Sequence, residues 1–271
     1  MEKPKVCVIR TDGTNCDRET KHAFELVGGN TDIVHMNTLI KGYDPASKRK
    51  VKLSDYDILA IPGGFSNGDY IAAGRIFSSD LEHFLGDEIN EFASSDKLII
   101  GICNGFQALV KYGLLPQLDG RVEQTTTLTY NDSGRFRCDW VNLVKPDGNG
   151  EKCIWTRGIE SIDLPIAHGE GKFNAEARLM DRLFRDGQVV FQYADNQGNP
   201  TMDHPENPNG SLRSIAGICD PSGQIFGLMP HPERYWKPGN HRLYTKQKID
   251  GTAPSEGLGL QIFRKGVEYF R

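Results

Sequence analysis

The segment from Leu98 to Gln107, Leu-Ile-Ile-Gly-Ile-Cys-Asn-Gly-Phe-Gln, constrains the fold more than any other part of the chain. Its apolar start predicts a buried strand, and the residues after Cys103 predict a helix that runs to about Tyr112 and stops at a glycine. Gly101 and Gly105 stand two residues either side of the cysteine and allow a sharp turn from strand to helix. This is the cysteine form of a nucleophile elbow, which predicts that Cys103 stands at the carboxyl end of a sheet.

The first half of the chain alternates short apolar runs with amphipathic stretches, the pattern of a parallel sheet with helices on both faces. We predict strands at Val6–Ile9, Asp32–His35, Ile58–Ile61 and Leu98–Ile102. Two further helices are predicted at Asp17–Val27 and Ser79–Ala93. The second half changes to short strands separated by Gly, Pro, Asn and Asp turns. Those strands are predicted at Arg137–Val144, Ile162–Ala167, Gln188–Ala194, Leu212–Cys219 and Ile225–Met229, before a last helix at Gly259–Phe270 that packs back on the sheet.

The expected fold class is therefore α/β: an open, mostly parallel sheet flanked by helices, with an added antiparallel strand region. At 271 residues, the chain is predicted to form a single domain over residues 1–271. Two segments fit this plan less well. The polar, turn-rich stretch Gly239–Gly257 is predicted to be a loop or lid, and Tyr43–Leu53 is interpreted as an insert.

Composition argues against several classes of function. The 32 basic and 36 acidic residues give a net charge of −4, which disfavours the clustered basic surface that nucleic acid requires. No apolar stretch approaches the roughly 20 residues of a membrane helix, and the first residues do not resemble a signal peptide. The six cysteines include no CxxC pair, which argues against a disulfide scaffold and against a zinc site. We therefore expect a cytoplasmic protein with no metal and no membrane or nucleic-acid partner.

Cys103 has the surroundings that a nucleophile requires. At the N-terminus of its helix the thiol meets the positive end of the helix dipole, which favours the reactive thiolate. The backbone N–H of Asn104 is left free to face an oxyanion. The competing interpretation is an ordinary buried cysteine at the end of a core strand, which the glycine frame makes weaker.

A thiolate nucleophile also requires a group that moves protons, and the segment Met229-Pro-His-Pro-Glu-Arg234 offers one. Pro232 favours an extended conformation for His231, so residues 231 and 233 can project to the same side. Glu233 is then placed to orient the imidazole and to complete a Cys–His–Glu relay. Alone, a His-Pro-Glu sequence is more often a surface turn; it gains weight by its pairing with the elbow.

Two glycine-rich segments follow predicted strands and suit a small polar substrate. The first, Ile61-Pro-Gly-Gly-Phe-Ser-Asn-Gly-Asp69, lets the backbone approach a substrate and offer amides to a developing charge. It is not a nucleotide-binding P-loop, because the pattern GxxxxGK[ST] occurs nowhere in the chain. The second, His168-Gly-Glu-Gly171, lacks the spacing of a zinc motif and could hold a substrate by hydrogen bonds. An ordinary turn remains an alternative for both.

Together and in this order, the four motifs resemble the class I (triad) glutamine amidotransferases, a family with a flavodoxin-like fold. Within that class they are similar to the glutaminase subunits of phosphoribosylformylglycinamidine synthase, an enzyme of de novo purine biosynthesis. The motifs are Pro62–Asp69, Gly101–Gln107, Ala167–Gly171 and Leu228–Arg234, and the likeness runs from about Val6 to Arg234. The insert Tyr43–Leu53 and the tail after Arg234 lie outside it, and partner docking is one role for them.

The resemblance implies a role for each motif. Cys103 would attack the side-chain amide of glutamine to give a glutamyl thioester. His231 would protonate the departing ammonia and then activate water, while Glu233 orients the imidazole. The oxyanion hole would be formed by backbone amides of Gly64, Phe65 and Asn104. The glutamine-binding residues would be Gln107, His168, Gly169 and Glu170.

One residue departs from the family pattern: Asn67 stands where an aromatic residue is expected, which puts a peripheral contact in doubt. The resemblance also implies a division of labour between subunits. ATP, magnesium and formylglycinamide ribonucleotide belong to a separate synthetase (PurL-type) subunit, usually joined by a small bridging (PurS-type) subunit, and ammonia passes between them. The present chain is then expected to bind no cofactor of its own, which agrees with the missing P-loop.

Three other functions stay open at this point. Triad amidotransferases that serve anthranilate, guanylate or imidazole glycerol phosphate synthesis have similar nucleophile frames but usually lack this combination of motifs. A different cysteine hydrolase or a DJ-1-like protein would explain Cys103 but not the His231–Glu233 pair. A non-catalytic regulatory subunit of the same fold would be expected to have lost a relay residue, and none is lost.

Overall fold

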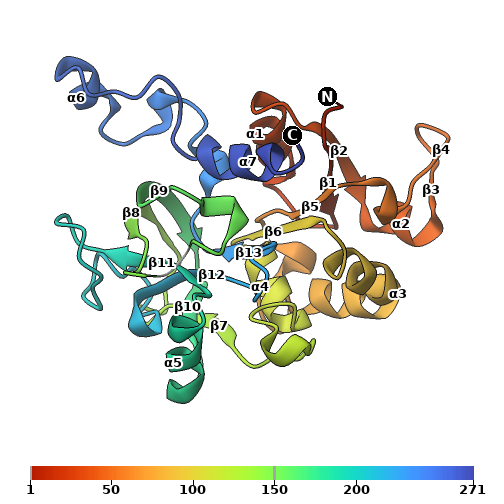
Figure 1. Ribbon diagram of the computed structural model, residues 1–271, viewed down its shortest axis with the longest axis horizontal. Helices are drawn as coiled ribbons and strands as arrows, with labels where there is room; N and C mark the ends of the chain where they lie inside the picture. Colours follow the sequence, from red (N-terminus) through yellow and green to blue (C-terminus); the bar gives the residue numbers. More distant parts are fainter. Residues whose placement is uncertain (1, 149–150) are drawn as a thin grey trace.

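The computed structural model describes residues 2–148 and 151–271 and places the predicted strands in one nine-stranded sheet (Figure 1). From one edge to the other the strands are β2 (Asn30–His35), β1 (Lys5–Arg10), β5 (Ile58–Ile61), β6 (Leu98–Ile102), β13 (Ile225–Leu228), β12 (Ile215–Cys219), β11 (Val189–Ala194), β8 (Arg137–Val144) and β9 (Ser161–His168).

The sheet has a parallel half and an antiparallel half that meet at β13. Strands β2, β1, β5, β6 and β13 pair in parallel, whereas every pairing from β13 onward to β9 is antiparallel. Most parallel strands are buried along their whole length, which explains why they appear in the sequence as unbroken apolar runs. In β9, buried residues alternate with partly exposed ones, as expected for a strand with one buried face. The predicted α/β sheet with an added antiparallel region is confirmed.

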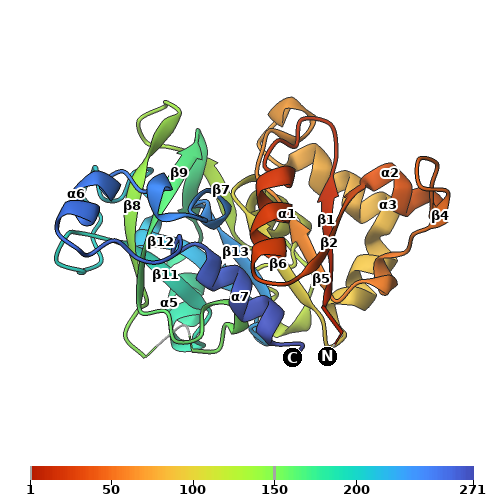
Figure 2. The same cartoon turned by 90° about the horizontal axis from the view of Figure 1, so that it is seen from above.

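Helices cover both faces of the sheet. Helices α1 (Asp17–Leu26) and α7 (Leu260–Glu268) lie on one side, and α3 (Arg75–Ala93) and α4 (Asn104–Tyr112) lie on the other (Figures 1 and 2). The predicted last helix, α7, packs mainly on α1 and on the 3₁₀ turn Ile154–Thr156. Phe263 meets Phe24 edge-on at 4.9 Å, and a Cβ on Gly266 would lie only 2.4 Å from the Trp155 ring, so α7 fits closely there.

Several short elements escaped sequence analysis. They are α2 (Met36–Lys41), α5 (Ala177–Arg185), α6 (Tyr244–Ile249), and two antiparallel two-stranded sheets, β3 (Tyr43–Asp44) with β4 (Arg49–Lys50) and β7 (Thr127–Tyr130) with β10 (Glu170–Asn174). The loop prediction for Gly239–Gly257 is thus wrong in part, because α6 lies inside it. None of the residues of α6 is buried, so the helix has no apolar face to reveal it in the sequence.

Two boundaries also differ from the sequence prediction. Helix α3 begins at Arg75 rather than at Ser79, directly after Gly74 in the left-handed conformation. The predicted strand Leu212–Cys219 begins only at Ile215, because Arg213 and Ser214 have positive φ angles and form a 3₁₀ turn.

The ends of the central strands position the candidate site. Strands β5, β6 and β13 are parallel neighbours, so the segments that follow them meet at the same edge of the sheet. These segments are the loop after Ile61, the elbow at Cys103 and the turn at His231. Among the described helices, none is long and apolar enough to cross a membrane.

The packing of α7 generates a stability prediction. Phe263→Ala removes a fully buried ring from the contact with Phe24 and should lower the free energy of unfolding by about 3–5 kcal/mol. Ile249→Ala on α6 is the control, because that side chain is 80% exposed and its loss should change stability by less than about 0.5 kcal/mol. Urea unfolding monitored by circular dichroism measures both; equal effects would contradict the assignment of α7 to the core.

Candidate active site

The backbone at Cys103 has a conformation that few residues adopt. Cys103 stands between strand β6 and helix α4, and its φ is 52° and its ψ −105°. A Cβ on Gly105 would lie 1.9 Å from the Ile61 carbonyl oxygen, and one on Gly101 would lie 2.7 Å from the Gly105 carbonyl oxygen. Both glycines are therefore required by the close approach of β5, β6 and α4. The predicted elbow is present, with its strain held by the surrounding packing.

Cys103 contacts two other strands of the sheet, β13 and β9. Its N–H donates to the Leu228 carbonyl of β13 at 2.8 Å, and its thiol lies 3.8 Å from the Ala167 carbonyl of β9. The Cys103 carbonyl accepts the first hydrogen bond of α4, from the Gln107 N–H. Asn104 is the first residue of α4, so its N–H has no partner within the helix and is suited to face an oxyanion.

His231 and Glu233 form a buried pair just beyond β13. His231 Nδ1 and Glu233 Oε1 are 2.6 Å apart, and the two residues are 1% and 0% exposed. Burial by itself lowers the pKa of His231, but the Glu233 carboxylate and the nearby Cys103 and Cys16 thiols outweigh it and raise the pKa well above its ordinary value. The imidazole is therefore suited to carry a proton in this site.

Gly63 lies against both Cys103 and His231. A Cβ at this position would lie 2.8 Å from His231 Cε1 and 3.4 Å from Cys103 Cβ. No larger residue could occupy it without moving the imidazole. The structure thus brings together the ends of β5, β6 and β13, as the three motifs predicted.

A cavity of about 200 Å³ opens beside Cys103. Its lining includes most of the residues predicted for oxyanion stabilisation and glutamine binding, namely Gly64, Phe65, Gln107, His168, Gly169 and Glu170. It also includes residues to which the sequence analysis gave no individual role, among them Asp69, Tyr130, Arg135 and Phe136. A volume of this size suits a single amino acid rather than a nucleotide.

The side chains of Asn104 and Gln107 hold the cavity walls together. Asn104 Oδ1 accepts hydrogen bonds from the Ser66 N–H and hydroxyl at 3.2 and 2.5 Å, and its Nδ2 donates to Asp69 Oδ1 at 2.9 Å. Gln107 accepts from Asn104 Nδ2 at 3.0 Å and donates to the Glu170 carbonyl. Helix α4 is thereby joined to the loop after β5 and to β10.

His168 is held in place by Asn131, the residue that follows β7. Its Nδ1 lies 3.1 Å from Asn131 Oδ1, and Asn131 Nδ2 donates to the His168 carbonyl at 2.9 Å. Burial, with a smaller contribution from His231, lowers the pKa of His168 to about 3. His168 is therefore a neutral imidazole that shapes the cavity wall.

One predicted oxyanion donor is not free. The Phe65 N–H donates to the Gly13 carbonyl at 3.0 Å, so in this conformation it does not offer a hydrogen to the cavity. The loop after β5 is hydrogen-bonded here to the segment after β1, a contact that no local pattern reveals, and the oxyanion role of Phe65 stays a prediction. Gly64, with a φ of 147°, lies against Asn15 in the same contact.

Sequence analysis also missed Cys16 and Arg234. Cys16 follows β1, and its Sγ accepts a hydrogen bond from Arg234 Nη2 at 3.1 Å beside His231. The rule that places sites at the carboxyl ends of parallel strands could have indicated Cys16, because β1 is the parallel neighbour of β5.

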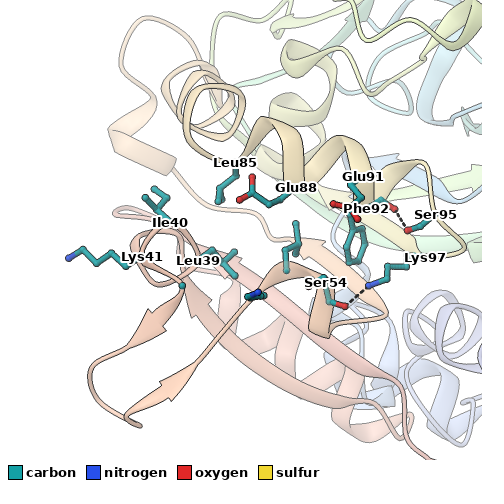
Figure 3. A pocket seen from close by; sticks show the side chains of 13 residues that line it. Leu39, Ile40, Lys41, Ser54, Leu85, Glu88, Glu91, Phe92, Ser95 and Lys97 are labelled. Carbon is teal, nitrogen blue, oxygen red and sulfur yellow. Dashed lines mark hydrogen bonds between the residues drawn. The ribbon is translucent and has the colours of Figure 1, made fainter.

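A larger cavity, of about 490 Å³, lies away from Cys103 between α2 and α3 (Figure 3). Leu39, Leu85 and Phe92 point into it, and the charged side chains Lys41, Glu88, Glu91 and Lys97 lie around them. It shares no lining residue with the Cys103 cavity, and its lining includes no cysteine or histidine. Although this cavity has the larger volume, it is therefore not the candidate active site.

The comparisons with known proteins agree with this geometry. The model of the CobB/CobQ-like glutamine amidotransferase domain matches residues 3–270. The chain is 44% identical to "Phosphoribosylformylglycinamidine synthase subunit PurQ" of Dehalococcoides mccartyi, covering 100% of this chain and 99% of that protein. It is 43% identical to the protein of the same name from Methanococcus maripaludis, with coverage of 98% and 97%.

Solved structures give the same picture. The chain is similar to a chain in "Structure of PurLQS from Thermotoga maritima", with a TM-score of 0.69, 31% identity and coverage of 100% of both chains. A putative GMP synthase subunit from Thermoplasma acidophilum, with a TM-score of 0.55 and 14% identity over 99% of this chain and 94% of that chain, shares the fold alone.

The buried, neutral His168 generates a pH prediction. The ordinary pKa of a histidine is 6.5, so below pH 6.5 the unfolded chain takes up a proton at residue 168. In the folded chain the pKa is about 3, so the folded chain takes up that proton only near pH 3. The free energy of unfolding should therefore fall as the pH drops, by about 2 kcal/mol between pH 7 and pH 5 from this group alone. In His168→Gln that part of the loss should vanish, as measured by urea unfolding at both pH values. An identical pH dependence in the variant would contradict a neutral His168.

Proposed function

The chain belongs to the CobB/CobQ-like glutamine amidotransferase family, and we infer that it is the glutaminase subunit of a phosphoribosylformylglycinamidine synthase. The observation that carries this inference is the buried His231–Glu233 pair beside the Cys103 elbow, in a chain similar along its whole length to subunits of that enzyme. The chain hydrolyses glutamine to glutamate and ammonia, for use by a synthetase subunit in de novo purine biosynthesis.

The proposed reaction runs through a thioester. Cys103 passes its thiol proton to His231 as Sγ attacks the side-chain amide carbon of glutamine, and Asn104 N–H stabilises the resulting oxyanion. The C–N bond then breaks, and His231 gives its proton to the leaving ammonia. Next His231 takes a proton from water, which attacks the thioester carbon. The C–S bond then breaks to release glutamate, and His231 returns its proton to the Cys103 sulfur. Throughout, Glu233 holds the imidazole through Nδ1.

The charges around the cavity support an amino acid as the substrate. Asp69 and Glu170 place two carboxylates in its lining, which suits the α-ammonium group of glutamine. Arg135 lines the same cavity and suits the α-carboxylate. Gln107, His168 and Gly169 would complete the site by contact and by shape. We assign glutamine binding to these residues as part of the same proposal.

Exposed apolar side chains near the cavity support a partner that docks there. Phe65, Tyr130 and Phe136 line the cavity yet are 45%, 64% and 51% exposed. Tyr70 and Ile71, even more exposed, stand between the lining residues Asp69 and Ala73. Such clusters mark protein interaction sites, and a synthetase subunit seated here would receive ammonia directly. The name PurLQS of the similar Thermotoga structure supports a PurL-type synthetase partner.

Further elements of the proposal concern cofactors, assembly and location. We propose that ATP and magnesium bind to the synthetase rather than to this chain, and that a small PurS-type subunit bridges the two. A cytoplasmic location is supported by the six free thiols, which are typical of a reducing compartment.

The test of this function is glutamine-dependent synthesis in the complex assembled with the synthetase, ATP and formylglycinamide ribonucleotide. Cys103→Ala should abolish it, because the thioester cannot form. Ammonia supplied directly should still support synthesis, which controls for folding and assembly. A diazo-ketone analogue of glutamine should label Cys103 and spare Cys138, the exposed cysteine. Glutaminase activity retained by Cys103→Ala would refute the assignment.

The relay generates a separate prediction. His231→Ala should lower steady-state glutamate release by about a thousandfold or more, because both proton transfers use this imidazole. Glu233→Gln should cost less, because it orients the ring and transfers no proton. A larger loss in Glu233→Gln than in His231→Ala would show that the proposed roles are wrong.

A further inference from the structure

The segment Asn207-Pro-Asn-Gly-Ser211 is a turn whose polar side chains are buried, and the thioester route does not use it. In the sequence it is one of the Gly, Pro and Asn turns between predicted strands. Yet Asn207, Asn209 and Ser211 are only 2%, 1% and 0% exposed. Polar side chains buried to this degree are expected to have hydrogen-bond partners, and those partners show what the turn holds.

Strand β10 contains a bulge directly after Glu170. Glu170 and Lys172, two positions apart on β10, lie opposite consecutive residues of β7, so Gly171 is an extra residue in this strand. A bulge takes its extra residue out of the ladder and can re-aim a neighbouring side chain, and bulges are frequent next to active sites. Here the neighbour is Glu170, which lines the Cys103 cavity and whose carboxylate accepts the Ala73 N–H at 3.2 Å.

Asn209 and Ser211 hold the bulge in place. The Gly171 carbonyl accepts hydrogen bonds from Asn209 Nδ2 at 2.9 Å and from Ser211 Oγ at 3.3 Å. Asn209 Nδ2 also donates to Tyr193 Oη at 3.2 Å, and Tyr193 is a fully buried residue of β11. The Ser211 hydroxyl in turn accepts the Phe173 N–H at 3.0 Å. These bonds attach the bulge to the nine-stranded sheet.

The turn itself is fixed by internal hydrogen bonds and by a close backbone contact. Asn207 Oδ1 accepts the N–H groups of Gly210 and Ser211 at 3.0 and 3.1 Å. Gly210 has a φ of 78°, and a Cβ there would lie 1.9 Å from Asp132 Oδ2. The Asn209 carbonyl accepts the Asp132 N–H at 3.2 Å, which joins the turn to the segment after β7. Asn209 is therefore presented to the bulge at a fixed position.

We propose that Asn209 is a positioning residue for glutamine binding: it sets the bulge at Gly171 and so aims the Glu170 carboxylate at the α-ammonium group of the substrate. Three contacts fix Glu170. Gln107 donates to its carbonyl, Ala73 donates to its carboxylate, and Asn209 donates to the carbonyl of the next residue. Without the Asn209 amide, the bulge can relax and turn the carboxylate away from the substrate. The inference rests on the proposed glutaminase function, in which Glu170 meets that ammonium.

The test is the glutamine dependence of synthesis in the complex assembled with the synthetase, ATP and formylglycinamide ribonucleotide. Asn209→Ala should raise the KM for glutamine about tenfold or more, because a shift of about 1 Å breaks an ammonium–carboxylate hydrogen bond. The kcat should change little, since the Cys103 elbow is not altered.

Asn199→Ala is the matched control. Asn199 is an exposed amide that bonds to Asp195 in its own turn, so its loss should leave the KM for glutamine unchanged. An unchanged KM in Asn209→Ala, or a loss confined to kcat, would overturn the inference. Glutamine-dependent synthesis by the unaltered complex would then leave the proposed function standing, whereas its absence there would refute that function instead.

A second substrate separates positioning from a general loss of shape. Glutaramate, which is glutamine without its α-amino group, has no ammonium for Glu170 to bind. Asn209→Ala should therefore lower kcat/KM for glutamine far more than for glutaramate, as should Glu170→Gln. In the double variant the loss should stay close to that of Glu170→Gln alone, because both changes remove the same contact. Equal losses with both substrates, or additive losses in the double variant, would show that Asn209 does not act through Glu170.

A second variant guards against one that fails to fold. Asn209→Asp keeps the size of the side chain and the oxygen that accepts the Ser211 N–H at 2.9 Å, but loses the donor to Gly171. In the full chain carrying this change, iodoacetamide, which has no ammonium, should alkylate Cys103 at the unaltered rate. The diazo-ketone analogue of glutamine should label Cys103 more slowly. Unaltered labelling by the diazo-ketone, or equal slowing of both reagents, would overturn the inference.

Discussion

The close approach of helix α4 to strand β5 is the contact on which the rest of the site depends. Gly105 lies so near the Ile61 carbonyl that any side chain there would collide with it. This contact forces the turn at Cys103 and aims the N-terminus of α4 at the thiol. It also sets the positions of Asn104 and Gln107, whose amides reach the loop after β5 and the start of β10. One backbone contact thus fixes the position of Cys103 and of two walls of the cavity.

The antiparallel half of the sheet contributes what the parallel half cannot. Strand β9 ends at His168, and the chain turns at Gly169 to leave the main sheet as β10. Asn131 clamps that turn through hydrogen bonds to the His168 ring and carbonyl. The site therefore combines a buried charged pair, His231 with Glu233, and a neutral imidazole on the facing wall. The two histidines differ because only His231 has a carboxylate and thiols beside it.

The sequence was most informative where one short segment determines the structure. The elbow, the buried parallel strands and the His231–Glu233 pair follow from glycine spacing, apolar runs and a proline, all of which act locally. Helices α2 and α6 were missed because they are six residues long and lack a clear apolar stripe. The bond from Phe65 to Gly13 and the position of Cys16 escaped for another reason: both depend on which strands are neighbours in the sheet. Local patterns predict elements, but contacts between distant loops require the topology.

The central position of β13 has a consequence for biosynthesis. During translation β1, β2, β5 and β6 emerge first and can pair, but β6 keeps an unpaired edge until residues 225–228 have been made. Such an edge can pair with other chains, so the nascent protein is exposed to aggregation for more than a hundred residues of synthesis. The same order of synthesis keeps the proposed Cys–His relay incomplete in the nascent chain. Cys103 is made early, but the histidine that would activate it arrives with the strand that seals the sheet.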